Sequence, residues 1–175
     1  MPTGPFAIQV YIKSPLLNGD TVPINQTVSV GVRVKNISSG PLWIVGVLDG
    51  SEVGLRYPHY LPSIEGPDYE MLKPEWPDFT SPLRKKDFRL LQPGEDFDPT
   101  APTNGAAYMP LIAFRDFVPL SAGRYHISLT LSTESANIRQ WLGTLPYATQ
   151  NDLTQQVEKV PRCKVVSDLL TFEAR

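Results

Sequence analysis

The sequence predicts an all-β fold, an immunoglobulin-like antiparallel sandwich of about seven to nine short strands. Three observations predict it: apolar residues alternate at period two in several segments, 18 prolines are spread over 175 residues, and no long helical run separates consecutive strands. Alternation is typical of strands with one buried face, and proline is excluded from helix interiors and central strands. A parallel βαβ arrangement needs a helix between strands, so the pattern favours a sandwich.

Three segments carry the clearest strand pattern. Residues 28–34 place valine at every second position, and residues 6–12 and 125–131 alternate apolar and polar residues in the same way. β-branched and aromatic residues fit a pleated, half-buried surface. We expect the apolar members of all three segments to face one core: Phe6, Ile8, Val10, Ile12, Val28, Val30, Val32, Val34, Tyr125, Ile127, Leu129 and Leu131.

Weaker patterns complete the strand set. Residues 42–48 are apolar on both faces, as in a central strand, and residues 87–91 form a short strand before a turn. Residues 108–117 form an apolar run that Pro110 makes an edge or interrupted strand. The chain ends in a strand over 164–174 with a bulge at Ser167-Asp168.

One or two short helical turns are predicted beside these strands. The first covers Ser135 to Leu142, with Ser135 as its N-cap. The second covers residues 149–160, where Leu153 and Val157 are spaced i, i+4 and therefore share one face.

A proline- and aromatic-rich insertion over residues about 50–82 interrupts the single domain predicted for residues 1–175. The period-two pattern disappears from 57 to 82, and long segments without regular structure are uncommon in compact domains unless they are functional. Proline reduces the entropy lost on ordering, and tyrosine and tryptophan supply large contact area. We predict a binding surface here, while packing of the same aromatics over an open sheet face stays the alternative; the residues are Tyr57, His59, Tyr60, Tyr69, Trp76 and Phe79.

Two motifs resemble those of a known class of domain. Leu91-Gln92-Pro93-Gly94-Glu95 closes a strand, and Gly123-Arg124-Tyr125 opens a late one. The pair resembles bacterial immunoglobulin-like and fibronectin-III-like domains and is distantly similar to intracellular proteinase inhibitors of the BsuPI type. The resemblance implies a tyrosine corner, in which the Tyr125 hydroxyl bonds to upstream backbone. It also implies an inhibitor-like role.

The sequence carries no recognisable catalytic or nucleotide-binding motif. G-x-S-x-G, the P-loop and G-x-G-x-x-G are all absent, and only two histidines and one cysteine, Cys163, are available as zinc ligands. We therefore predict that the chain is not an enzyme and holds no cofactor and no metal. Calcium stays open as an alternative, because three carboxylates lie near expected strand ends: Asp49, Asp96 and Asp98.

Charge and hydropathy limit the classes of partner. A net charge of −2 gives no field that attracts nucleic acid or an anionic membrane, and no stretch is apolar enough to span a bilayer. With no signal-peptide pattern and one cysteine, the default location is cytoplasmic. We predict a non-catalytic binding module for a protein partner and leave its oligomeric state open. The alternative is a carbohydrate-binding module with aromatic platforms at Trp43, Tyr57, Tyr60 and Trp76.

Overall fold

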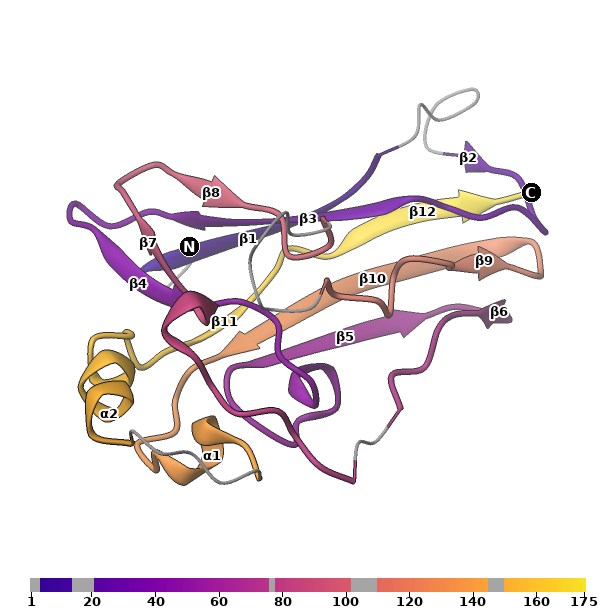
Figure 1. Cartoon of the computed structure of the whole chain (residues 1–175). Coiled ribbons are helices and arrows are strands. Elements are labelled where there is room, and N and C mark those ends of the chain that lie inside the picture. The colour runs from indigo at the N-terminus through magenta and orange to yellow at the C-terminus, as the bar shows by residue number, and fades with distance from the viewer. Residues whose placement is uncertain (1–3, 14–20, 76–77, 102–109, 145–149) are drawn as a thin grey trace.

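Strands dominate the fold, and the prediction of an all-β protein is confirmed (Figure 1). The computed structural model describes residues 4–13, 21–75, 78–101, 110–144 and 150–175. Its strands are β1 (Phe6–Ile12), β2 (Thr21–Val22), β3 (Val30–Asn36), β4 (Leu42–Val45), β5 (His59–Glu65), β6 (Tyr69–Glu70), β7 (Phe88–Leu91), β8 (Asp96–Phe97), β9 (Val118–Pro119), β10 (Gly123–Ser132), β11 (Lys164–Val166) and β12 (Leu170–Ala174). Its helical segments are η1 (Ser51–Val53), η2 (Lys85–Asp87), α1 (Arg139–Leu142) and α2 (Gln150–Glu158).

The first sheet has the order β1-β3-β8 and is antiparallel. Its register pairs Ile8 with Val34 and Val10 with Val32, so that apolar side chains of both strands leave the same face. Two smaller antiparallel pairs, β4 with β7 and β6 with β9, lie outside this sheet. The alternating apolar residues of β1 and β3 therefore form one apolar face of the sheet.

The second sheet is built around β10. Strand β5 pairs with β10 over residues 126–132, and β11 and β12 pair with β10 at its two ends, with β2 parallel to β12. The expectation that residues 57–82 lack regular structure is wrong for β5, which the sheet holds throughout its length. Pro62 hid this strand from the sequence pattern. Among the described strands β5 pairs only with β10, and an edge strand tolerates proline.

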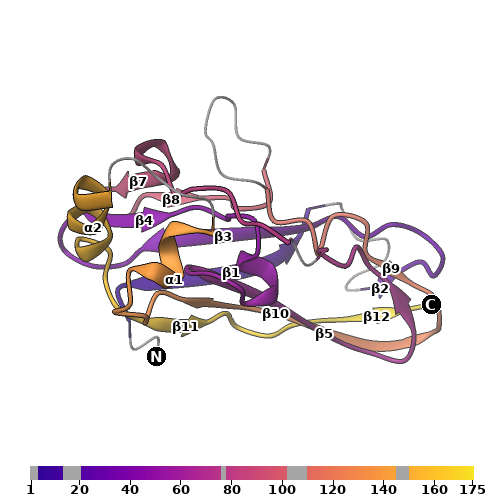
Figure 2. The same cartoon turned by 60° about the horizontal axis from the view of Figure 1, so that its bottom comes forward.

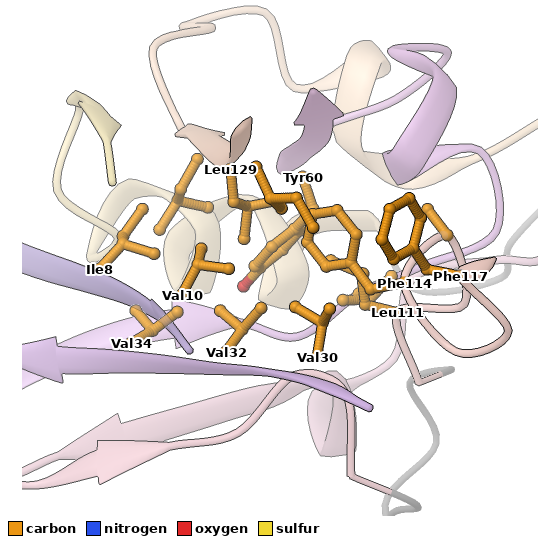
Figure 3. Packing of buried hydrophobic residues seen from close by; sticks show 14 of the residues in the cluster. Ile8, Val10, Val30, Val32, Val34, Tyr60, Leu111, Phe114, Phe117 and Leu129 are labelled. Atoms are coloured by element: carbon orange, nitrogen blue, oxygen red, sulfur yellow. The ribbon is translucent and has the colours of Figure 1, made fainter. Parts of the chain in front are cut away.

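The two sheets face each other and share one core. Figure 2 shows them as two layers, and Figure 3 shows the valines of β3 facing Leu129 and Tyr60. Of the residues predicted to face the core, all are buried except Ile12, which is partly buried. The close-packed interior therefore forms where the alternation predicted it. The immunoglobulin-like classification of this arrangement stays a prediction.

The two helices cover a second apolar cluster at one end of the molecule (Figure 1). Trp141 of α1 and Leu153 and Val157 of α2 pack there with Val45 and Phe88 from the β4–β7 pair. The shared face predicted for Leu153 and Val157 is confirmed. The first helix begins later than expected, at Arg139, and its N-cap is Ile138 instead of Ser135.

The strand predicted over residues 108–117 is wrong for its described part. Residues 113–116 form a turn, and Phe117 makes a single bridge to Val28. The backbone N–H groups of Ile112 and Ala113 are taken by the carboxylate of Glu52 and are not available to a ladder. The Glu52 carboxylate therefore satisfies two backbone N–H groups that a neighbouring strand would otherwise pair with.

Two other strands are shorter than the sequence suggests. The strand expected over residues 42–48 ends at Val45, after which the Leu48 N–H donates to the Ser51 hydroxyl. The C-terminal strand is interrupted at residues 167–169, where the predicted bulge lies. The Ser167 hydroxyl accepts the Leu129 N–H at this break. In both places a serine hydroxyl accepts a backbone N–H near the break.

Candidate functional site

The predicted aromatic residues do not form one surface. Tyr57 and His59 lie together at the start of β5, with ring centroids 3.8 Å apart, and Tyr57 also lies 5.7 Å from the buried ring of Trp141. Both side chains are partly buried. Burial lowers the pKa of His59 below its usual range, because an apolar setting disfavours the charged imidazolium.

Tyr60 belongs to the core. Its side chain is 0% exposed and its hydroxyl donates to the carbonyl oxygen of Val45 at 2.7 Å. The prediction that Tyr60 contributes to a contact surface is therefore wrong, and the alternative of aromatic packing over a sheet holds for this residue. Alternation along β5 explains the difference, since His59 and Tyr60 point to opposite faces.

The remaining predicted residues are scattered. Tyr69 lies beyond the other end of β5, where its ring packs beside Phe117 and Tyr125 and its hydroxyl donates to the carbonyl oxygen of Ile64. Phe79 is 70% exposed. Trp76 lies outside the described residues. Among the described aromatics, only Tyr57 and His59 are brought together as predicted.

A groove of about 390 Å³ lies beside η1 and draws most of its walls from the predicted insertion. Its lining residues come from three stretches of chain: Val47, Leu48, Asp49, Gly50 and Glu52; Leu72, Lys73, Pro74 and Glu75; and Ile112 and Arg115. Six of these eleven residues fall within positions 50–82. The groove therefore overlaps the predicted insertion, but none of the described residues predicted for the binding surface lines it.

Glu52 fastens two walls of the groove together. Its carboxylate accepts the N–H of Ile112 at 3.1 Å and that of Ala113 at 2.9 Å. The pKa of Glu52 is raised, because burial disfavours the carboxylate more than these two hydrogen bonds favour it. Among the described residues, the partners of the half-buried Glu52 carboxylate are therefore two backbone N–H groups and no side-chain cation.

The short turn that presents Glu52 depends on two glycines. Gly50 and Gly54 flank η1 with φ angles of +83° and +73°, a left-handed conformation that other residues rarely adopt. At Gly50 an added Cβ would also lie 3.0 Å from the Cβ of Leu55. The spacing of these glycines is the one sequence signal that marks this turn.

A buried ion pair holds the same end of the groove. The Arg56 side chain is 3% exposed, and its guanidinium donates to the carboxylate of Asp49 at 2.9 Å and to the carbonyl oxygens of Ser81 and Trp141. Burial lowers the pKa of Arg56, and the Asp49 charge counteracts this shift. The pair connects the groove to the second apolar cluster through Trp141.

The other charged residues that line the groove are Lys73, Glu75 and Arg115. Arg115 lies 3.6 Å from the carboxylate of Asp116, and both side chains are well exposed. Lys73 and Glu75 are exposed and carry opposite charges two residues apart. Of the described residues, none forms an ion pair with Glu52.

The three carboxylates considered for calcium do not converge. Asp49 pairs with Arg56, Asp96 with Arg33 at 3.5 Å, and Asp98 with Lys13 at 3.2 Å. Within the described ranges, no three histidine, cysteine or acidic side chains gather in a way that could hold a metal ion. Each of these carboxylates therefore has a protein cation in place of a shared ion.

The candidate acid–base and nucleophilic groups also lie apart. His59 and His126 pair with opposite ends of the β5–β10 ladder, with partners Ser132 and Glu65. Cys163 is half-buried beside Thr133, and burial raises the pKa of its thiol, which disfavours the reactive thiolate. These groups are not arranged around one reacting centre.

Comparison of the chain with models of protein families, with curated proteins and with solved structures finds no match. In the part of the chain that the structure describes, no helix has both the length and the apolar character needed to cross a bilayer.

Proposed function

We propose that this chain is a non-catalytic binding module that holds a segment of a protein partner in the groove beside η1. The observation that carries the proposal is the groove itself. Its volume of about 390 Å³ falls within the range of ligand-binding sites, and its eleven described lining residues include five apolar and five charged ones. Such a mixture supplies contact area and fixes the orientation of a bound segment.

The groove is held in shape before any partner arrives. Glu52 ties η1 to Ile112 and Ala113, and Arg56 ties Asp49 to the backbone at Ser81. A preformed site loses less conformational entropy on binding than one that must order its loops. An inhibitor-like role in the cytoplasm is one version of this function and rests on the sequence resemblance.

A protein partner is favoured over carbohydrate by the composition of the walls. Sugar rings stack on aromatic faces, and none of the eleven described residues that line the groove is aromatic. Two platforms considered for sugar binding are also taken up by packing: Tyr60 is fully buried and Trp43 packs against the second cluster. The proposal therefore replaces the aromatic surface with the groove.

Filling the groove tests this proposal. Ile112→Trp adds bulk to a wall, and Leu169→Trp, at an exposed site between β11 and β12, is the matched control. We expect the wild type and Leu169→Trp to capture the same polypeptide from a lysate. After identification and purification, that polypeptide should bind the wild type directly and lose at least about tenfold in affinity for Ile112→Trp. Equal affinity for the wild type and Ile112→Trp contradicts the groove as the site.

A further inference from the structure

Resting on the proposed function, we infer that the bound segment presents a lysine or arginine side chain to Glu52. Glu52 lines a groove whose neighbouring walls include the apolar residues Leu72, Pro74 and Ile112. A lysine or arginine side chain has an aliphatic stem and a cationic end, so it matches apolar walls that lead to a carboxylate. The chemical class of the ligand is thus an aliphatic cation.

The charge balance of the groove singles out Glu52 as the acceptor. Asp49 is paired with the buried Arg56, and Arg115 lies next to Asp116. Among the described residues, the carboxylate of Glu52 has the N–H groups of Ile112 and Ala113 as its partners and no side-chain cation. A cation brought by a partner supplies the opposite charge that the described part of the chain does not.

The electrostatics of Glu52 support the same assignment. Its pKa is raised by burial, so the folded chain holds this carboxylate in a setting that solvates it less well than water. Hydrogen bonds to charged groups are stronger than neutral ones, and partial removal from water strengthens them further. An arriving cation therefore gains more at Glu52 than at the exposed Glu75.

The residues that flank the lysine distinguish a polypeptide from a free amine. A side chain delivered by an extended segment brings flanking backbone and side chains into contact with the remaining walls. A small amine contacts only the region around Glu52. A peptide is consequently expected to bind more tightly than an amine of the same chain length.

Amide chemical shifts of the intact, isotope-labelled protein test the inference. The probes are a short capped alanine peptide with one central lysine, the same peptide with norleucine in that place, and pentylamine. We expect the lysine peptide to shift the amide signals of Ile112 and Ala113 and to bind about tenfold more tightly than the norleucine peptide. Pentylamine should bind more weakly than the lysine peptide.

Charge-removing variants locate the effect. Glu52→Gln keeps an oxygen acceptor for the two N–H groups, and it should reduce the affinity for the lysine peptide to that of the norleucine peptide. Glu173→Gln, which alters an exposed carboxylate paired with Arg124, should leave the affinity within about twofold of the wild type. If Glu52→Gln does not fold, the comparison of lysine with norleucine on the wild type still decides.

Each other outcome overturns the inference in a defined way. Equal binding of the two peptides, or no shift with any probe, would show that Glu52 does not recognise a cationic side chain. The groove as a partner-binding site is then tested by Ile112→Trp alone. Binding of pentylamine as tight as that of the lysine peptide assigns the site to a free amine instead of a polypeptide.

Discussion

The guanidinium of Arg56 lies 2.9 Å from the carboxylate of Asp49, and the Arg56 side chain is almost fully buried. The same guanidinium donates to backbone carbonyl oxygens at Ser81 and Trp141. One residue therefore joins the wall of the groove, the segment that follows residues 76–77, and helix α1. This junction holds the Asp49 wall of the groove in place.

Replacing Arg56 with methionine should destabilise the fold. Arg56→Met removes the donors to Ser81 and Trp141 and leaves Asp49 without its cation, so we expect a loss of about 3 kcal/mol in the free energy of unfolding. Urea unfolding measures it. Arg124→Met, which breaks the exposed pair with Glu173, is the control and should cost less than about 1 kcal/mol. Similar losses for the two variants would show that the buried pair has no special structural role.

The hydroxyl of Tyr125 should contribute measurably to stability. It lies 2.8 Å from the carbonyl oxygen of Ser121 and 2.6 Å from that of Asp68, so the predicted bond to upstream backbone is present. Tyr125→Phe removes the hydroxyl of a buried ring from two partly buried hydrogen bonds and should cost about 1–3 kcal/mol in urea unfolding. Tyr11→Phe, on the outer face of β1, should change stability by less than about 0.5 kcal/mol. No difference between the two variants would contradict a structural role for the hydroxyl.

His59 should make stability depend on pH. Its pKa is lowered by burial in the folded state, whereas the unfolded chain takes up the proton near the ordinary value of 6.5. Between these two values the unfolded state binds more protons, so stability is full above pH 6.5 and is lost as the pH falls toward the lowered pKa. Acidification therefore favours unfolding of the wild type.

Melting temperatures of the wild type and His59→Gln at about pH 7.5 and about pH 5.5 check this sign. The wild type should lose more stability than His59→Gln on acidification, since all other titrating groups are shared. His126→Gln leaves His59 in place and should behave as the wild type does. A larger acid loss in His59→Gln would reverse the assignment.

Much of the fold could be predicted from the sequence because its core strands alternate at period two. Residues of β3 and β10 show this pattern without interruption, and their apolar members are buried as expected. Strand β5 could not be predicted, since Pro62 and partial exposure of both faces obscure its alternation. The prolines predicted turns and loops over residues 57–82, whereas Pro62 lies in an edge strand of seven residues.

The sequence indicated the insertion as the segment that contains a binding surface, but it did not indicate the residues that line the groove. Glu52 contacts the backbone of residues 60 and 61 positions away, and Arg56 contacts Trp141, 85 positions away. Charged residues are expected at the surface, and no local pattern marks those whose partners lie so far along the chain. The aromatic residues were predicted to form the surface because aromatic side chains are common in contacts. Tyr60 instead lies in the core, and Tyr69 packs against it.

A photo-crosslinking amino acid placed at position 73 reports whether a partner occupies the groove, because Lys73 is exposed and lines it. The same amino acid at position 169, an exposed site between β11 and β12, is the control. We expect the purified partner to form a crosslink at position 73 and not at 169, and Ile112→Trp to abolish the crosslink. A crosslink of equal yield at both positions, or one that survives Ile112→Trp unchanged, would contradict the account.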